Sequence, residues 1–301
     1  MSESELTKPI ISLSPKTKKI DLDDWGTTET QRVPEMIILY GNMGSGKTYK
    51  YCSLIQAAHR IDKSTRGFVV STEKGIFRNI LEFPYLEVNE VVRMMSCQNI
   101  DEVMARCSEL LGSGQLRMSD WVVIDLASTV WDQFPDLYAR KVLKKGDTNT
   151  PGSGSETMIM EYIKDGGVGN VFFEHYQTGI NPFWHRWDTK LRESGANVIL
   201  VCGETALTEE EVRGHKKKDS KETIAMYKDA GQLPSVQKKT SFQYHTVIHC
   251  SRPYIGRGRF VRTVKDQGRD PIGGGGEIEL KALEKTTTFG EYYLREIGSW
   301  V

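Results

Sequence analysis

The chain has no excess of charge of either sign. Its 301 residues contain 40 lysines and arginines and 40 aspartates and glutamates, so the formal net charge is zero. Such a balance indicates no general attraction to nucleic acid, although charges gathered on one face still steer a partner.

Cysteine pairs and long apolar runs are also absent from the sequence. The five cysteines form no Cys-x-x-Cys pair, which predicts reduced thiols rather than disulfides or a metal site. No apolar run approaches the roughly 20 residues of a membrane span, and the first residues lack the basic start and apolar core of a secretion signal. We therefore expect a soluble protein with no membrane partner, in the cytoplasm, or in the host cytoplasm if the chain is viral.

The organisation of the chain changes near Pro34. Residues 1–33 are mostly polar and predict a partly flexible N-terminal extension, whereas residues 34–301 predict one domain in which short apolar runs alternate with helical patterns. Some of these runs lack polar alternation, as do strands covered on both faces. The fold class is therefore α/β, with a mostly parallel central sheet flanked by helices. The expected strands are residues 35–40, 67–72, 91–95, 121–126, 197–202, 245–250 and 259–265.

Helix and loop signals lie between the expected strands. Residues 47–61 predict a helix, and a capping box formed by Asn99 and Glu102 opens another at residues 99–112. Residues 144–156 are rich in turn-forming residues and residues 209–222 are highly charged, so both predict mobile loops.

A glycine-rich segment follows the first expected strand and matches the phosphate-binding pattern G-x-x-x-x-G-K-[ST] at every fixed position. Its glycines allow a tight turn that points backbone N–H groups at phosphate oxygens, and the helix after it adds the positive end of its dipole. Lys47 is expected to reach the β- and γ-phosphates, and the Thr48 hydroxyl to bind Mg²⁺. The segment thus predicts binding of ATP and Mg²⁺ by Gly41, Asn42, Met43, Gly44, Ser45, Gly46, Lys47 and Thr48.

Two acidic residues after other expected strands suggest a hydrolysis site. Asp125 ends an apolar run and is placed to hold Mg²⁺ beside the phosphate loop, with a helix N-cap as the alternative. Leu126 follows it, where many phosphate-loop hydrolases carry a water-activating glutamate. Glu73 is the candidate general base, because the carboxyl ends of parallel strands line the ligand crevice. The alternative for Glu73 is an exposed loop glutamate.

With these motifs in this order, the chain resembles RecA-like P-loop ATPases and, more narrowly, the RecA-type recombination ATPases carried by phages. The likeness spans about residues 34–270 and includes the phosphate loop and the segments HTVIHCSRPY and RFVRTVKDQGR. It implies that residues 41–48 are the Walker A loop, Glu73 the catalytic glutamate and Asp125 the Walker B aspartate. It also implies that Glu204, after the run NVILVC, occupies the sensor position.

The sequence departs from this family in two places. Gly203 and Glu204 stand where the family has a sensor glutamine, which bears on the coupling between the γ-phosphate and DNA. Lys265 and Arg269 match imperfectly the Lys-x-Arg pair with which hexameric relatives reach a neighbouring subunit's nucleotide. The resemblance implies a homo-oligomeric ATP hydrolase that acts on DNA, preferably single-stranded, in recombination, annealing, replication or packaging.

Three other functions stay open from the sequence. A P-loop kinase of a small phosphate acceptor shares the loop, although residues 209–222 hold one arginine where a kinase lid holds several. A GTP-driven switch needs Asn-Lys-x-Asp, which is absent, and Ser128 stands where it needs glycine. A slow, nucleotide-gated structural subunit would keep the same pocket without using Glu73 as a base.

Three further groups of residues have two interpretations each. His245 and His249 are expected to be hydrogen-bonded rather than to bind zinc. The aromatic residues of segment 172–187 are expected to pack along a helix rather than to stack on bases. Lys144–Lys145 and Lys216–Lys218 are either solvated or candidate DNA contacts.

Overall fold

The computed structural model describes residues 33–73, 83, 86, 90–142, 179–207, 221–252, 259–266, 278–279 and 287–296. Except for Val33, all of these belong to the unit Pro34–Val301. The basic pairs at 144–145 and 216–218, the loop 144–156 and most of the loop 209–222 lie outside the described residues. The division of the chain at Pro34 stays a prediction.

All seven expected strands form, and each lies within one residue of its predicted bounds. The strands are β1 Met36–Tyr40, β2 Gly67–Ser71, β3 Val92–Ser96, β4 Trp121–Asp125, β5 Asn197–Cys202, β6 Glu204–Ala206, β7 Gln232–Pro234, β8 Thr246–Ser251, β9 Phe260–Asp266 and β10 Ile278–Glu279. The helices are α1 Lys47–Ile61, α3 Ile100–Gly112, α4 Ala127–Val142, α7 Asn181–Arg192, α9 Lys221–Tyr227, α10 Thr240–Gln243 and α12 Phe289–Glu296. No helix in the described ranges is long and apolar enough to cross a membrane.

Eight strands form one sheet in the order β10-β9-β8-β1-β5-β4-β2-β3. The pairs from β8 to β3 are parallel, whereas β9 and β10 add antiparallel pairs at one edge. The predicted α/β fold with a mostly parallel sheet is confirmed. The strand with the phosphate loop comes first, followed by the strands that precede Glu73, Asp125 and Glu204, as the resemblance to RecA-like ATPases implies.

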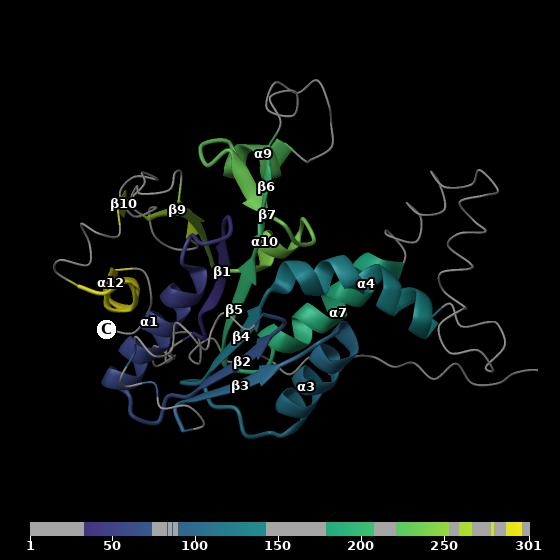
Figure 1. Cartoon of the computed structure of the whole chain (residues 1–301), viewed down its shortest axis with the longest axis horizontal. Coiled ribbons are helices and arrows are strands. Elements are labelled where there is room, and N and C mark those ends of the chain that lie inside the picture. The colour runs from purple at the N-terminus through teal and green to yellow at the C-terminus, as the bar shows by residue number, and fades with distance from the viewer. Residues whose placement is uncertain are drawn as a thin grey trace, which may run out of the picture. The chain divides into compact units, whose positions relative to one another are not determined.

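Helices cover both faces of the sheet (Figure 1), with α1 and α12 on one face and α3, α4 and α7 on the other. The side chains of β1 alternate between two cores. Ile37 and Leu39 pack with α1 and α12, and Ile38 and Tyr40 pack on the opposite side. Strands β1, β4 and β5 are buried along their whole length, which explains their unbroken apolar sequences.

The predicted helix at 99–112 begins at its expected cap. The Asn99 Oδ1 atom accepts a 3.0 Å hydrogen bond from the Glu102 N–H, while the Glu102 carboxylate accepts one from the Gln98 N–H, one residue earlier than a capping box requires. In the aromatic segment, Trp184 of α7 is buried and packs edge-on against Phe134 of α4. The described aromatic residues of that segment, Phe183, Trp184 and Trp187, therefore lie in or against the core.

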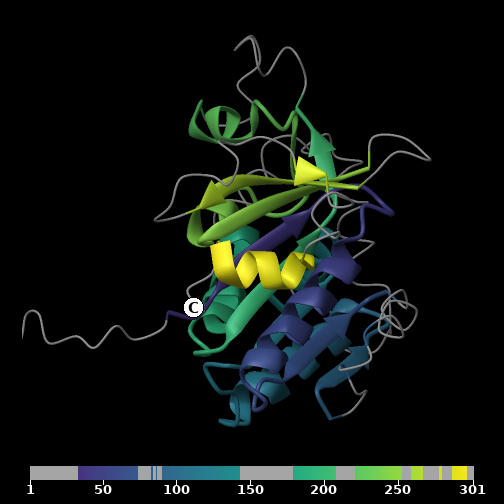
Figure 2. The same cartoon turned by 90° about the vertical axis from the view of Figure 1, so that its left-hand side faces the viewer.

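The helix α12 lies against α1 (Figure 2), although more than 200 residues separate them in the chain. Gly290 makes this approach, and its N–H donates a 2.9 Å hydrogen bond to the Ser53 hydroxyl. A Cβ atom at Gly290 would overlap the backbone of Ser53 and Leu54. At the next turn, the buried Tyr293 hydroxyl donates to the Glu35 carboxylate at 3.0 Å. Glycine is thus needed for the helix contact that joins the end of the described chain to the core.

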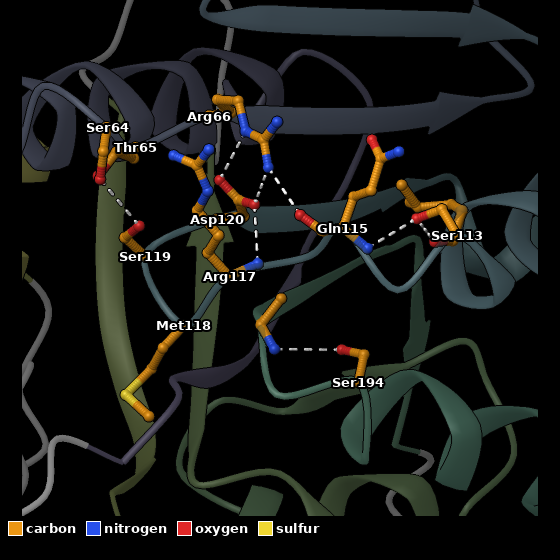
Figure 3. Close-up of polar contacts among 12 residues, drawn as sticks. Ser64, Thr65, Arg66, Ser113, Gln115, Arg117, Met118, Ser119, Asp120 and Ser194 are labelled. Carbon is orange, nitrogen blue, oxygen red and sulfur yellow. Dashed lines mark hydrogen bonds and ion pairs between the residues drawn. The ribbon is translucent and has the colours of Figure 1, made fainter.

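The amino ends of β2 and β4 carry a polar cluster (Figure 3). Arg66 donates two hydrogen bonds, of 2.6 and 3.1 Å, to the fully buried Asp120, which also accepts from the Arg117 N–H at 2.9 Å. Asn197 continues the cluster by donating to the Asp120 carbonyl oxygen. The guanidinium group thus supplies the counter-charge and the hydrogen bonds that the buried carboxylate needs.

Candidate functional site

The phosphate-loop segment connects β1 to α1 at the carboxyl edge of the sheet. Gly41 has a φ of 153°, and a Cβ atom there would overlap the carbonyl oxygen of Cys250 on β8. Gly46 is the N-cap of α1 in the left-handed region, with a φ of 80°. Both positions therefore need glycine, and together they turn the chain tightly enough to leave the helix N-terminus facing the loop.

The Lys47 ammonium group lies across this loop. Its Nζ atom donates hydrogen bonds of 2.7 Å to the Gly41 carbonyl oxygen and 2.9 Å to that of Asn42. These carbonyls are neutral, and no ion pair to Lys47 is found among the described residues. The Ser45 hydroxyl is buried and has no hydrogen-bond partner within the same described set. An ammonium, an unused hydroxyl and a helix N-terminus are the donor set that a phosphate group requires.

Asp125 lies at the carboxyl end of β4 and is 3% exposed. The Tyr51 hydroxyl donates to its Oδ2 atom at 2.9 Å, and the Thr48 hydroxyl lies near enough to lower the pKa of the carboxylate slightly. Burial raises the pKa of Asp125 from 3.8 to about 6, which the Tyr51 hydrogen bond opposes and the charge of Glu73 reinforces. The peptide bond that follows, Asp125–Leu126, is cis.

This group of oxygen atoms fits a hard divalent cation. A buried carboxylate with a raised pKa gains from a nearby positive charge, and the Thr48 hydroxyl supplies a second oxygen of the type that Mg²⁺ prefers. Thr48 lies in the first turn of the helix after the phosphate loop, and Asp125 ends a strand at the same carboxyl edge of the sheet, so the cation would also meet a bound phosphate. The residues named from the sequence for metal binding, Thr48 and Asp125, are therefore neighbours in the fold.

Glu73 follows β2, the strand beside β4. Ser71 is aligned with Asp125 in the parallel pair, and the Thr72 N–H donates to the Asp125 carbonyl oxygen at 2.7 Å. The Ser71 hydroxyl donates to the Glu73 carbonyl oxygen and accepts from its N–H, at 2.6 and 3.0 Å. The Glu73 side chain is exposed, yet close enough to raise the pKa of Asp125. Its backbone is thus held beside the expected metal ligand, and its role as a base stays a prediction.

Glu204 begins β6, directly beyond the end of β5. Its Oε2 atom lies 3.0 Å from the Nε2 atom of His249 on β8, so the pair spans the end of β1. The His249 ring stacks on that of Tyr40, with centroids 4.8 Å apart. The structure therefore places the expected sensor residue in a hydrogen bond with one of the two histidines, and its role as a sensor stays a prediction.

Lys265 of β9 contacts its own chain. Its Nζ atom donates to the carbonyl oxygens of Ser241, Phe242 and Tyr244, at 3.0, 3.0 and 2.7 Å, and so closes the C-terminal end of α10. Burial lowers the pKa of Lys265. A role for Lys265 across a subunit boundary stays a prediction, and Arg269 lies outside the described residues.

Three residues near the site are not predicted from the sequence. Tyr51 had a usable signal, because it lies three positions after Thr48 on α1 and must share its face. Arg252 and Arg259 had none, because they belong to the connection between β8 and β9. Their guanidinium groups approach the phosphate-loop glycines: a Cβ atom on Gly44 would lie 3.5 Å from Arg252 Nη1, and one on Gly46 would lie 3.4 Å from Arg259 Nη1.

Comparisons with known proteins find likeness in structure without a sequence relative. No family model matches the chain, and no curated protein matches it. The chain is similar to a solved KaiC-like protein from Pyrococcus horikoshii OT3, with 15% identity, a TM-score of 0.43, and 82% of this chain and 90% of that one covered. It is also similar to the RadB recombinase, with 13% identity, a TM-score of 0.44, and coverage of 83% and 89%. For a third solved structure, an ATPase domain, the identity is 9%, the TM-score 0.41, and the coverage 83% and 81%.

Proposed function

We propose that the protein binds ATP with Mg²⁺ and hydrolyses it as a RecA-like ATPase whose turnover is coupled to DNA. One observation carries the ATPase part of this proposal. The carboxyl edge of the sheet brings the phosphate loop, Thr48 and the buried Asp125 together, with Glu73 on the adjacent strand end. Phosphate binding, metal binding and water activation are the three tasks that hydrolysis of a phosphoanhydride requires.

The residues of the site would divide these tasks. Lys47 would exchange its two loop carbonyls for phosphate oxygens, and the N–H groups at the start of α1 would bind the same anion. Thr48 and Asp125 would hold Mg²⁺, which when bound neutralises charge on the phosphates and orients them. Glu73 would orient the attacking water and accept its proton.

Coupling to DNA and assembly into a homo-oligomer form the second part of the proposal. The order of the motifs in the sequence supports them, from the phosphate loop through Glu73 and Asp125 to Glu204 at the sensor position. A phage origin belongs to the same part of the proposal.

The test is ATP hydrolysis with and without single-stranded DNA, in the wild type, in Lys47→Ala and in Lys63→Ala. Lys63 is an exposed lysine just beyond α1 and serves as the matched control for loss of one charge. We expect Lys47→Ala to abolish hydrolysis, Lys63→Ala to keep it, and DNA to stimulate the active proteins. Hydrolysis that survives in Lys47→Ala would refute the ATPase assignment, and hydrolysis indifferent to DNA would refute the coupling. Transfer of the phosphoryl group to a nucleotide or sugar instead of water would identify a kinase.

A further inference from the structure

The Tyr51 hydroxyl is directed at the carboxylate of the expected metal ligand. Tyr51 is fully buried, and its 2.9 Å hydrogen bond to Asp125 Oδ2 lies wholly inside the protein. It lies three positions after Thr48 on α1, so the helix presents both hydroxyls to the same carboxylate. Helix α1 and strand β4 are therefore linked at the site by the hydrogen bond from Tyr51 to Asp125, with the Thr48 hydroxyl nearby.

The Tyr51 ring and its hydroxyl have separable roles. The ring belongs to the apolar core beside Leu54 and Ile55, and a phenylalanine ring would fill that space equally well. The hydroxyl adds no apolar contact. Its partner is a carboxylate at the carboxyl edge of the sheet, beside the phosphate loop. If stability alone were needed, apolar residues in place of this buried polar pair would serve as well.

We infer that Tyr51 is a positioning residue for Mg²⁺ binding, whose hydroxyl fixes the orientation of the Asp125 carboxylate so that its other acceptor sites would be available to the metal. The inference rests on the proposed function. A carboxylate that accepts one hydrogen bond at Oδ2 cannot rotate without breaking that bond, and other acceptor sites stay available to a metal or its bound water. Removal of a hydrogen bond to a metal-binding side chain commonly lowers the affinity for the metal by about tenfold or more.

The fold supplies a matched control. Tyr293 is also fully buried, belongs to the same core, and donates from its hydroxyl to a carboxylate, Glu35, at 3.0 Å. Glu35 precedes β1 at the amino edge of the sheet, opposite the phosphate loop. Tyr51→Phe and Tyr293→Phe therefore remove the same chemical group from the same core. The first removes it at the carboxyl edge of the sheet, beside the phosphate loop, and the second removes it at the amino edge.

The experiment measures ADP affinity by calorimetry, in Mg²⁺ and in EDTA, for the wild type and both variants. We expect Tyr51→Phe to weaken ADP binding about tenfold in Mg²⁺ and to leave it unchanged in EDTA, because the hydroxyl acts through the metal. Tyr293→Phe is expected to match the wild type in both conditions. In ATP hydrolysis, Tyr51→Phe should raise the Mg²⁺ concentration for half-maximal rate by a similar factor, with kcat at saturating Mg²⁺ within about threefold of the wild type.

Each result separates the inference from the function on which it rests. Equal Mg²⁺ dependence in Tyr51→Phe and the wild type, with Lys47-dependent hydrolysis intact, would overturn the positioning role alone. A loss of ADP affinity in EDTA as well would assign Tyr51 to the folding of the loop and overturn the role. The absence of Lys47-dependent nucleotide binding in the wild type would overturn both the function and the inference.

Discussion

Replacement of Asp125 by asparagine should stabilise the nucleotide-free protein while abolishing its expected activity. The carboxylate is 3% exposed, and its pKa lies at about 6, against an ordinary 3.8. At about 1.4 kcal/mol per pKa unit, this difference corresponds to about 3 kcal/mol of destabilisation whenever the group is ionised. Asparagine has the same shape, keeps an oxygen for the Tyr51 hydroxyl and carries no charge.

The effect of Asp125 on the free energy of unfolding depends on pH. Because the pKa of Asp125 is higher in the folded than in the unfolded state, the folded state binds the proton more tightly, and this site favours folding increasingly as the pH falls from about 7 to about 4. The advantage of Asp125→Asn in free energy of unfolding should therefore be about 3 kcal/mol at pH 8 and close to zero at pH 4. Urea unfolding in EDTA without nucleotide, at both pH values, measures this difference.

Asp120→Asn is the control at the other end of the same strand. Asp120 is also fully buried, but its carboxylate accepts two hydrogen bonds from Arg66. Breaking a buried pair of this kind costs about 3 kcal/mol, so this variant should be less stable than the wild type at pH 8. Equal losses of stability in Asp125→Asn and Asp120→Asn at pH 8 would refute the reasoning, and so would an advantage of Asp125→Asn that does not change with pH.

Two further predictions concern other contacts. Gly290→Ala should lower the free energy of unfolding by about 2 kcal/mol or more, because its Cβ atom would overlap the backbone of α1. Thermal unfolding measures the loss. An unchanged melting temperature would show that the contact between α12 and α1 does not stabilise the fold. Arg259→Ala should weaken ATP binding several-fold in low salt, with less effect in high salt, because it removes a cation beside Gly46 at the start of α1. Titration of a fluorescent ATP analogue tests this, and an effect that is independent of salt would contradict an electrostatic cause.

The sequence predicts the local features of this fold well. The seven strands and the helix after the phosphate loop depend on unbroken apolar runs and on capping residues, which act over a few positions. Asp125 was named from the sequence because it ends an apolar strand downstream of a phosphate loop, with a helix N-cap as the alternative. Tyr51 was not predicted, although helix periodicity puts it on the same face of α1 as Thr48.

Contacts between distant segments were not predictable from these patterns. Lys265 binds three backbone carbonyls at the end of α10, and no side-chain pattern in the sequence records a backbone acceptor. The contact of Gly290 with Ser53 joins segments 237 residues apart. The pairing of Glu204 with His249 likewise depends on the order β5-β1-β8 in the sheet, which the chain order does not give.

The two buried aspartates at opposite ends of β4 differ in the partners of their carboxylates. At the amino edge, Asp120 is paired with Arg66 in a fixed bidentate geometry, and that carboxylate has its counter-charge within the fold. At the carboxyl edge, Asp125 accepts a hydrogen bond from the Tyr51 hydroxyl but has no ion pair within the described residues, and Lys47 is bound to neutral carbonyls. A fold that buries a carboxylate without a paired cation, near a lysine that binds only neutral groups among the described residues, gains stability from a ligand that carries both charges. A nucleotide phosphate with its bound Mg²⁺ is such a ligand.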